Sequence, residues 1–480
     1  MYLKQVSLTN FRCFDSLTIE LHPRLTVLVA ENGGGKTAIL DAIARGLSPV
    51  LRFLSSANQR LSGAGVQDVD IRLKNNRACD YTRIYLAATA FSGELEWDVT
   101  KAASHQNQMD QKTGHKQIAD YAAALLGKVD EHDQRLLPVF AYYGARRGSI
   151  EIPSRLRIPR KKNVNYDYPT SALHESLDAE SDLKEMLRWF DAEESSELRA
   201  NMSIEQLLEE SGASFSFSPR LMEVRRAIGI LIGKQYEHPR FNERHKFVIS
   251  SKADKTEFQI SQLSQGYQSM LALGMDFARR LGLANEHVAK IPDGTPISDY
   301  LKHAVERLNP GDASFLSHKG PAWAPAIMLV DEIDLHLHPS WQQRVLGDLM
   351  RAFPGTQFIV TTHSPQVLTT VKRENIRMLG RNPDGAWEAL QPPQEIKGVE
   401  SAVALNEVMG VNPIPPVDEA KWLADYTAKI ENGTHADPEG AALREKLLSL
   451  YGPAHPVMLD ADRLIRFQSF KLSKGTAPEG

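Results

Sequence analysis

The sequence predicts an α/β protein with a mixed sheet, a short inserted helical arm and a small helical appendage at its C-terminal end. The sheet is indicated by three short apolar runs at 25–29, 326–330 and 357–360, each followed by polar or glycine residues. The arm is indicated by apolar residues at helical spacing between 171 and 232. The appendage is indicated by helical segments that follow the proline-rich stretch 412–416.

Composition sets the limits of the molecule. A chain of 480 residues exceeds one ordinary core, so we expect two or three lobes. The 42% hydrophobic content is that of a globular protein, and we find no apolar run of membrane-spanning length. Cys13 and Cys79 give no disulfide framework, which favours a cytoplasmic location. With a net charge of −4, any nucleic-acid binding requires a local basic patch.

The first run leads into a glycine-rich loop and then a helical stretch at 38–44, the context of a phosphate-binding P-loop. Backbone N–H groups of such a loop surround phosphates, and the helix N-terminus adds partial positive charge. Lys36 is expected to reach the β- and γ-phosphates, and the hydroxyl of Thr37 to bind Mg²⁺. The predicted ATP-binding residues here are Asn32, Gly33, Gly34, Gly35, Lys36 and Thr37.

The second run ends in two adjacent carboxylates, Asp331 and Glu332. Unpaired charges after a buried strand are costly, so the pair favours a metal site of the Walker B kind. Asp331 is predicted to hold the magnesium, and Glu332 to orient or activate the attacking water. The third run is followed by His363, which resembles the switch histidine of ABC-type ATPases, and this resemblance implies that it senses the γ-phosphate.

A further motif precedes the carboxylates. Residues 263–266 read Leu-Ser-Gln-Gly at the start of a helical run that extends over 270–281. Ser264 and Gly266 are expected to cap the helix or present N–H groups to a γ-phosphate. Alone, this pattern is common at helix starts. Its meaning comes from the motifs around it.

The order of P-loop, Leu-Ser-x-Gly signature, Walker B, D-loop at 334–339 and switch histidine resembles the ABC-type ATPases. The resemblance implies ATP and Mg²⁺ as cofactors. It also implies at least a homodimer, because the signature of one subunit closes on the P-loop of another. The opening Asn10-Phe11-Arg12 between two strands at 3–8 and 17–21 resembles RecF and SMC proteins. In that group this arginine lies near nucleotide or DNA; a solvated turn residue is the alternative for Arg12.

This reading divides the chain into four parts. They are an ATPase lobe at 1–145, a basic loop with a helical arm at 146–244, a second ATPase lobe at 245–400 and a helical module at 411–480. Strands are expected at 69–73, 82–91 and 95–100, forming an antiparallel sheet. The basic loop, with Arg146, Arg147 and five further basic residues up to Lys162, either contacts phosphate or connects domains. ABC-type ATPases also carry a glutamine loop that helps to hold magnesium. Gln67 is a candidate for this glutamine, but its surroundings in the sequence do not single it out.

The Leu-His-Leu-His-Pro D-loop, together with Val-Phe-Ala-Tyr-Tyr-Gly before a pair of arginines, resembles PtuA. PtuA is the AAA ATPase of the Septu anti-phage system, and its relatives accompany some retrons. The resemblance implies a partner HNH nuclease like PtuB, nucleic-acid contact through that complex, and no membrane. The helical module is a candidate contact for the nuclease, and a plain packing role is equally open.

The same nucleotide motifs occur in the OLD nucleases, which continue into a Toprim domain. Asp460 and Asp462 are the only matching fragment here, and a helix cap before 464–465 is the better interpretation. We therefore expect no intrinsic nuclease activity. The competing function is a RecF-like DNA-repair ATPase that clamps DNA. A soluble transporter subunit is disfavoured by the Asn-Phe-Arg hairpin and by the His-Leu-His sequence at 336–338.

Overall fold

The structure is a computed structural model that describes residues 1–55, 61, 63–103, 113–127, 135–145, 168–179, 183–211, 216–289 and 320–475. The chain divides into two compact units, Met1–Met409 and Gly410–Gly480. Each unit is described by itself below. The basic segment predicted at 146–162 lies outside the described residues.

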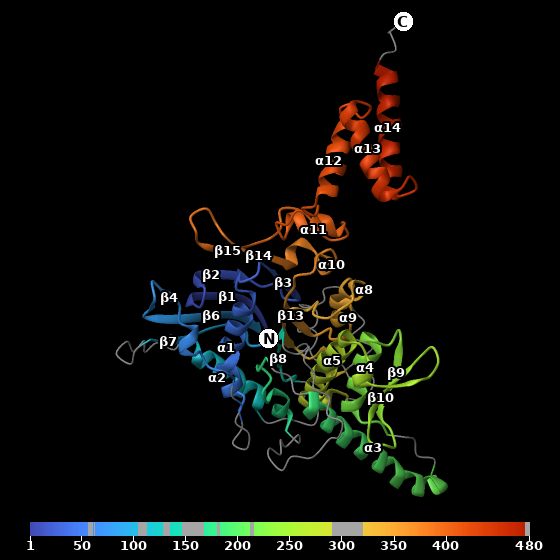
Figure 1. The fold of residues 1–480 in the computed structure, drawn as a ribbon. Helices are drawn as coiled ribbons and strands as arrows, with labels where there is room; N and C mark the ends of the chain where they lie inside the picture. The colour runs from blue at the N-terminus through green and yellow to red at the C-terminus, as the bar shows by residue number, and fades with distance from the viewer. Residues whose placement is uncertain are drawn as a thin grey trace. The chain divides into compact units, whose positions relative to one another are not determined.

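A mixed sheet forms the centre of the first unit (Figure 1), with strand order β15-β14-β3-β13-β12-β8. Neighbouring strands from β14 through β8 are parallel, and β15 pairs antiparallel with β14. The strands are β3 (Leu25–Val29), β8 (Val139–Tyr143), β12 (Ala326–Val330), β13 (Thr356–Thr361), β14 (Ile376–Arg381) and β15 (Trp387–Leu390). The parallel strands end at one edge, so the loops that follow β3, β12 and β13 are neighbours. The predicted α/β fold with a mixed sheet is confirmed.

An antiparallel sheet with order β2-β1-β6-β7 lies beside the central one. Its strands are β1 (Tyr2–Phe11), β2 (Phe14–Glu20), β6 (Tyr81–Ala90) and β7 (Gly93–Ala102), and β4 (Leu73–Lys74) pairs with β5 (Arg77–Ala78) in a separate ribbon. The strand expected at 69–73 is wrong, because Asp68–Asp70 forms a 3₁₀ turn instead. The fully buried carboxylate of Asp70 accepts the N–H of Gln67 at 2.7 Å and closes that turn.

Helix α1 (Lys36–Phe53) packs on the antiparallel sheet. A Cβ added at Gly46 would lie 2.6 Å from Cδ1 of Leu86 in β6. The indole N–H of Trp97 in β7 donates to the carbonyl of Gly46 at 2.7 Å. These contacts anchor the helix that carries the P-loop lysine. Helix α2 (His115–Leu126) covers α1 and β7.

Helix α5 (Gln265–Ala284) is almost entirely buried and contacts β8 of the central sheet. Helix α4 (Pro219–Leu231) packs along it. A Cβ at Gly274 would lie 2.3 Å from Cδ1 of Leu231, so the two helices approach closely. The predicted arm also contains α3 (Leu183–Ser211), and a three-stranded sheet follows: β9 (Tyr236–Phe241), β10 (Phe247–Ser251) and β11 (Glu257–Gln259). Both α3 and α4 contribute to the one large hydrophobic core of the first unit.

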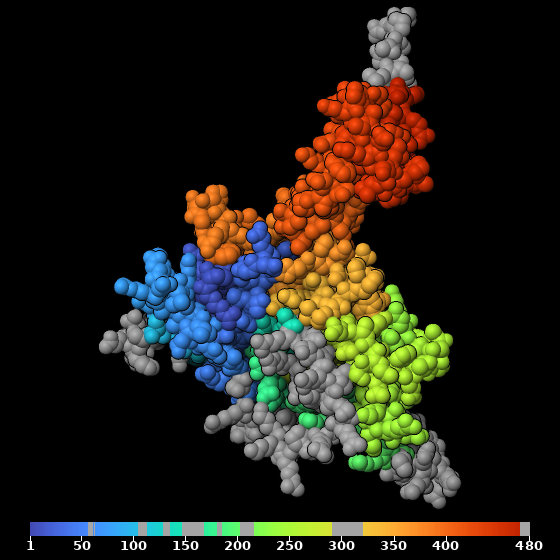
Figure 2. All heavy atoms as spheres, in the orientation of Figure 1, coloured from blue at the N-terminus to red at the C-terminus, as the bar shows by residue number. Residues whose placement is uncertain are grey.

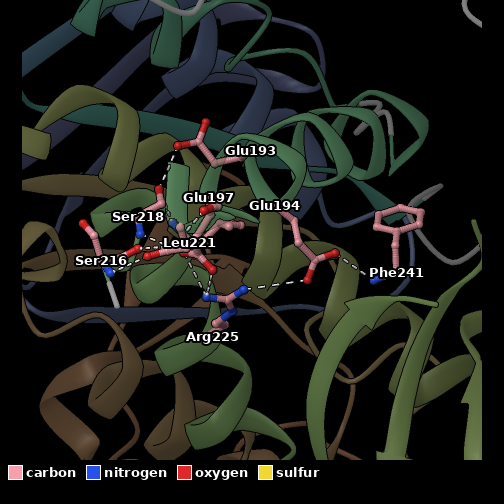
Figure 3. A network of polar contacts seen from close by, with 9 residues as sticks. Glu193, Glu194, Glu197, Ser216, Ser218, Leu221, Arg225 and Phe241 are labelled. Atoms are coloured by element: carbon pink, nitrogen blue, oxygen red, sulfur yellow. Dashed lines mark hydrogen bonds and ion pairs between the residues drawn. The ribbon is translucent and has the colours of Figure 1, made fainter. Parts of the chain in front are cut away.

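A polar network joins α3, α4 and β9 (Figure 3). The guanidinium of Arg225 contacts both carboxylate oxygens of Glu197, at 2.9 and 3.2 Å, and lies 3.7 Å from Glu194. Glu194 in turn accepts the N–H of Phe241 at 2.9 Å. Ser218 caps α4 and donates its own N–H to Glu197 at 2.7 Å. The network joins α3 and α4 to each other and to β9.

The remaining helices of this unit are α6 (Glu286–Ala289), α8 (Pro339–Gln342), α9 (Val345–Ala352), α10 (Pro365–Leu368) and α11 (Ser401–Glu407). Residues 343–344 separate α8 from α9, and Arg344 has a non-helical φ of −124° with ψ of −15°. The Arg344 guanidinium lies 4.5 Å from the centre of the Trp341 ring, a contact that this bend allows.

The second unit is a three-helix module of α12 (Asp418–Glu431), α13 (Pro438–Tyr451) and α14 (Pro456–Gly475). Its small core is formed by Tyr426, Ile430, Leu447, Met458 and Ala461. Asp460 and Asp462 lie inside α14, so the interpretation of this fragment as a helix cap is wrong. Asp462 pairs with Arg444 of α13 at 2.8 Å, and Asp460 pairs with Arg463 at 2.9 Å, contacts that stabilise the continuous helix.

Candidate functional site

The loop after β3 has the geometry of a phosphate cradle. Gly33 and Gly35 have positive φ of 79° and 83°, a conformation that side chains disfavour. At Gly34 an added Cβ would lie 2.6 Å from Cβ of Ala30. The path of the loop therefore requires all three glycines. Helix α1 begins at the next residue, so its free N–H groups face the loop.

Lys36, the first residue of α1, directs its ammonium group back into this loop. Its ammonium donates to the carbonyl oxygens of Ala30 and Glu31, at 2.9 and 3.2 Å. Burial lowers the pKa of Lys36, and the nearby carboxylate of Asp331 acts in the opposite direction. The ammonium is thus held inside the curve of the loop, where a bound phosphate would be surrounded by the same N–H groups.

The P-loop and the carboxylate pair meet at the edge of the sheet. The hydroxyl of Thr37 donates to Oδ2 of Asp331 at 2.8 Å, and the hydroxyl of Thr361 donates to Oδ1 at 2.6 Å. Asp331 is 4% exposed. A hydroxyl and a carboxylate at hydrogen-bond distance, open toward the P-loop, are the oxygen ligands that nucleotide-bound Mg²⁺ uses. The donor set therefore fits the ion, and Thr37 and Asp331 are the residues that would hold it.

Glu332 follows directly and has a positive φ of 50°. Its N–H donates to the hydroxyl of Thr361 at 2.7 Å. A left-handed glutamate costs conformational energy and persists where its surroundings hold it in place. The hydroxyl of Thr361 thus donates to the carboxylate of Asp331 and accepts the backbone N–H of Glu332, so one side chain contacts both residues of the pair.

The loop after β13 is tied to the D-loop. Asp334 accepts the hydroxyl of Thr362 at 2.6 Å and the N–H of His363 at 3.3 Å. The imidazole of His363 is partly exposed and forms no hydrogen bond with any residue that the structure describes. The backbone of His363 is fixed while its ring stays available, as a γ-phosphate sensor would require.

The signature motif lies at the start of α5. Ser264 is exposed at the N-cap position, and its side chain forms no capping bond. Gly266 lies against the D-loop, because a Cβ there would be 2.7 Å from the carbonyl oxygen of His336. Among the described residues, the side chain of Ser264 forms no hydrogen bond with the P-loop or with Asp331 of the same chain. One chain therefore assembles the P-loop side of the site and presents its signature serine to solvent.

Arg12 is held by two carboxylates. It has a positive φ of 49° in the turn between β1 and β2. Its guanidinium donates to Asp41 of α1 at 2.6 Å and to Asp70 at 3.0 Å. The interpretation of Arg12 as a solvated turn residue is therefore wrong. The turn is fastened to the helix that follows the P-loop, and direct contact with nucleotide stays a prediction.

Other candidates lie apart from this site. Gln67 is exposed, and it precedes the 3₁₀ turn that Asp70 closes. Nothing in this position indicates a glutamine loop. Among the described residues, no group of three or more His, Cys, Asp or Glu side chains could hold a metal ion. None of the described helices has both the length and the apolar character needed to cross a membrane.

Several residues that organise the site were not singled out from the sequence. Thr361 and Thr362 at the end of β13 bind Asp331 and Asp334, which follow β12. The feature of the sequence that could have indicated them is the pair of threonines between an apolar run and His363. Tyr142 of β8 donates its hydroxyl to Asp41 at 2.9 Å. Burial and the Asp41 carboxylate raise the pKa of Tyr142, so it remains a neutral donor. No local pattern indicated that contact.

Comparison with known proteins gives the family. Residues 5–269 match the model of a family described as an AAA domain, which is more than half of the chain. The chain belongs to this AAA family. Membership in this ATPase family, with the P-loop geometry above, supports ATP binding and hydrolysis.

Two known relatives extend over nearly the whole chain, and a third matches a shorter part of it. The retron Ec83 probable ATPase of Escherichia coli is 25% identical, over 95% of this chain and 85% of its own length. The retron Vc95 probable ATPase of Vibrio cholerae serotype O1 biovar El Tor is 25% identical, over 90% and 84%. The Septu protein PtuA of Bacillus thuringiensis is 33% identical over 89 residues, which are 18% of this chain and 22% of that one. The predicted relationship to the retron and Septu ATPases is confirmed.

Among solved structures, the chain is similar to an Smc head bound to the C-terminal winged-helix domain of ScpA. The identity is 16% and the TM-score 0.43, over 81% of this chain and 97% of that one. The head domain of SMC from Thermotoga maritima is 15% identical, with a TM-score of 0.40, over 82% of this chain and 99% of that one.

Proposed function

We propose that this AAA-family protein is the ATPase of an anti-phage defence system, that it self-associates through composite ATP sites, and that it controls a partner HNH nuclease. The observation that carries the ATPase part is the meeting of Thr37, Asp331 and Glu332 at the edge of the central sheet. The defence role is supported by the two retron ATPases that the chain resembles over most of its length. We place the protein in the cytoplasm.

The site residues have separate roles in hydrolysis. Residues 32–37 bind the phosphates through their N–H groups and the Lys36 ammonium. Thr37 and Asp331 hold Mg²⁺, which when bound neutralises charge on the phosphate oxygens. Glu332, fixed in its strained conformation, orients the attacking water and accepts its proton. His363 contacts the γ-phosphate side of the site.

A second copy completes this arrangement. The side chain of Ser264 is exposed and makes no capping bond to its own helix, so its hydroxyl and the adjacent N–H groups of α5 are free to meet a phosphate on another subunit. The smallest active unit is then a homodimer, and larger assemblies are compatible with the same contacts.

Cleavage of nucleic acid is assigned to a partner. In the part of the chain that the structure describes, no group of three or more His, Cys, Asp or Glu side chains could hold a metal ion, and Asp331 and Glu332 are assigned to the ATP site. Asp460 and Asp462 form ion pairs within their helical module. That module, 410–480, folds around its own core and is the proposed contact for the nuclease.

The decisive experiment begins with nucleotide binding. Calorimetry should show ATP–Mg²⁺ binding to the wild-type protein and its loss in Lys36→Ala, because the phosphates lose a charge-assisted contact. Lys234→Ala, which removes an exposed lysine elsewhere, should bind like the wild type. Unchanged binding in Lys36→Ala contradicts the P-loop assignment.

The second part tests the partner. Alone with Mg²⁺ or Mn²⁺, the protein should leave plasmid and single-stranded DNA intact, with or without ATP. With a PtuB-like HNH nuclease, cleavage should appear and respond to Lys36→Ala. Deletion of residues 418–480 should abolish nuclease binding and preserve ATP binding. Cleavage by the isolated chain that is lost in the Asp460→Ala, Asp462→Ala double variant would refute the assignment. ATP-dependent binding of DNA junctions without any nuclease would favour the RecF-like alternative.

A further inference from the structure

The hairpin formed by β14 and β15 lies far along the chain from every nucleotide motif at the N-terminus. Figures 1 and 2 nevertheless show this orange segment beside the blue strands β1 and β2. Strand β15 contacts β2, and β14 is the parallel neighbour of β3, the strand that leads into the P-loop. The free end of the hairpin is therefore on the P-loop side of the sheet.

Trp387 makes the contact between the hairpin and the turn that joins β1 to β2. Its indole N–H donates to the carbonyl oxygen of Cys13 at 3.0 Å. Its ring meets the ring of Phe14 edge-on, with centroids 5.0 Å apart and planes at 71°. On the indole itself, the Arg381 guanidinium lies 4.5 Å from the ring centre. Three contacts thus fix the orientation of this tryptophan.

The turn continues directly to the P-loop. Phe14 is fully buried beneath Gly35: a Cβ at Gly35 would lie 2.3 Å from Cζ of Phe14 and 2.9 Å from the sulfur of Cys13. Gly35 is the left-handed N-cap residue of α1 and immediately precedes Lys36. Because the side chains of Cys13 and Phe14 pack directly against Gly35, a movement of the turn should displace the backbone at the start of α1.

We propose that Trp387 is a positioning residue of the nucleotide site. It holds the turn of Cys13 and Phe14 under Gly35, so that the loop N–H groups and Lys36 are set for phosphate before ATP arrives. The proposal rests on the proposed ATP-binding function of the P-loop. Because Trp387 touches neither Asp331 nor Glu332 in the described contacts, it acts on nucleotide affinity rather than on the hydrolytic step.

The test compares three variants in a Cys79→Ser background, which leaves Cys13 as the one thiol of the chain. Trp387→Leu removes the ring and the N–H donor, and Trp387→Phe keeps a ring but removes the donor. Leu390→Ala changes an exposed residue of the same strand that lies away from the turn, and it is the matched control. Calorimetry with ATP–Mg²⁺ gives the affinity, and steady-state hydrolysis gives KM and kcat.

We expect Trp387→Leu to weaken ATP binding by about tenfold or more and Trp387→Phe by roughly threefold, the loss of one hydrogen bond. The value of kcat at saturating ATP should stay within about twofold, and Leu390→Ala should match the parent on every measure. Maleimide labelling of Cys13 should be faster in Trp387→Leu than in the parent. Circular dichroism at the assay temperature checks that each variant is folded.

Each outcome has a defined meaning. If the parent protein binds no ATP, the proposed function fails. If the parent binds ATP and Trp387→Leu binds equally well with unchanged Cys13 labelling, only the positioning role is overturned. The same holds if Leu390→Ala loses as much affinity, because the effect would then belong to the hairpin in general. Should Trp387→Leu not fold, unchanged affinity in Trp387→Phe overturns the proposal.

Discussion

Gly266 and His336 touch across two motifs: a Cβ added to the signature glycine would lie 2.7 Å from the carbonyl oxygen of the D-loop histidine. His336 has a positive φ of 59°, so the D-loop backbone at this point is already conformationally restricted. The start of α5 and the loop after Glu332 are therefore one packed unit. A displacement of either should be transmitted to the other.

Gly266→Ala tests this coupling. The added methyl group must push the D-loop backbone, because the facing atom is a carbonyl oxygen and not a flexible side chain. We expect ATP affinity to stay within about twofold, since the P-loop is untouched, and hydrolysis to fall by roughly tenfold or more. Gly229→Ala in α4, where a Cβ meets nothing within 4 Å, is the control. Normal hydrolysis by Gly266→Ala would show that this contact has no role in turnover.

Glu332→Gln separates binding from chemistry. Glutamine keeps the shape of the side chain but cannot accept a proton, so ATP should still bind and hydrolysis should fall by about 100-fold or more. The variant should also accumulate the closed assembly that ATP favours, visible by light scattering with ATP. Wild-type hydrolysis in the variant would move the catalytic role elsewhere, with His363 as the next residue to test.

Ser264→Arg examines the composite site. The serine is exposed and caps nothing, so arginine should be tolerated by the fold and should spare ATP binding. It should block closure, because a bulky side chain occupies the place of the partner's γ-phosphate. Mixing this variant with Lys36→Ala subunits should restore partial hydrolysis, since one site of a mixed dimer has both halves intact. If no mixing ratio restores hydrolysis although mixed assembly is confirmed, the arrangement in which the signature of one subunit completes the site of another is contradicted, unless both sites must act together.

Asp276 on α5 supports a prediction about stability. Its carboxylate accepts the hydroxyl of Tyr143 at 2.9 Å and pairs with Arg279 and Arg280 at 2.7 and 2.8 Å. Burial acts to raise the pKa of Asp276, but the two arginines outweigh it and lower the pKa to about 2. Asp276→Asn leaves buried positive charge uncompensated, so the free energy of unfolding should fall by about 3 kcal/mol.

The pH dependence follows from the sign of that shift. Because the folded pKa lies below the ordinary value of 3.8, the stabilisation is present above pH 3.8 and is lost as pH falls toward about 2. Denaturant unfolding between pH 5 and 2 should show this loss in the wild type and a flatter profile in Asp276→Asn. Asp120→Asn, an exposed aspartate on α2, serves as control. Parallel profiles for the wild type and Asp276→Asn would count against the role of this carboxylate.

Local sequence was sufficient for the parts of the site that are contiguous in the chain. The P-loop glycines, the carboxylates after β12 and the helix after Ser264 each lie within a few residues of one another. A strand that ends in Asp-Glu has the same chemistry wherever it packs. The order of these motifs was also enough to predict the mixed sheet and the AAA relationship.

Sequence was insufficient where a side chain chooses between distant partners. The run 69–73 has the composition of a strand, but the buried carboxylate of Asp70 pairs with Arg12, and residues 68–70 form a 3₁₀ turn. Aspartate is neutral to unfavourable in a helix interior, but Asp462 pairs with Arg444 of α13, and this contact favours a continuous α14. In both cases the deciding contact joins residues of different elements, which a short window of sequence does not contain.

By itself the sequence was enough to predict which residues would bind phosphate and metal, because those functions depend on residue type and short spacing along one strand, loop or helix. The tertiary structure alone decided that Arg12 would be held by Asp41 and Asp70, that Thr361 would contact both Asp331 and the backbone of Glu332, and that Trp387 would support the turn beneath Gly35. These contacts join residues that become neighbours only when the sheets close around one core, since burial forces each polar group to find a partner.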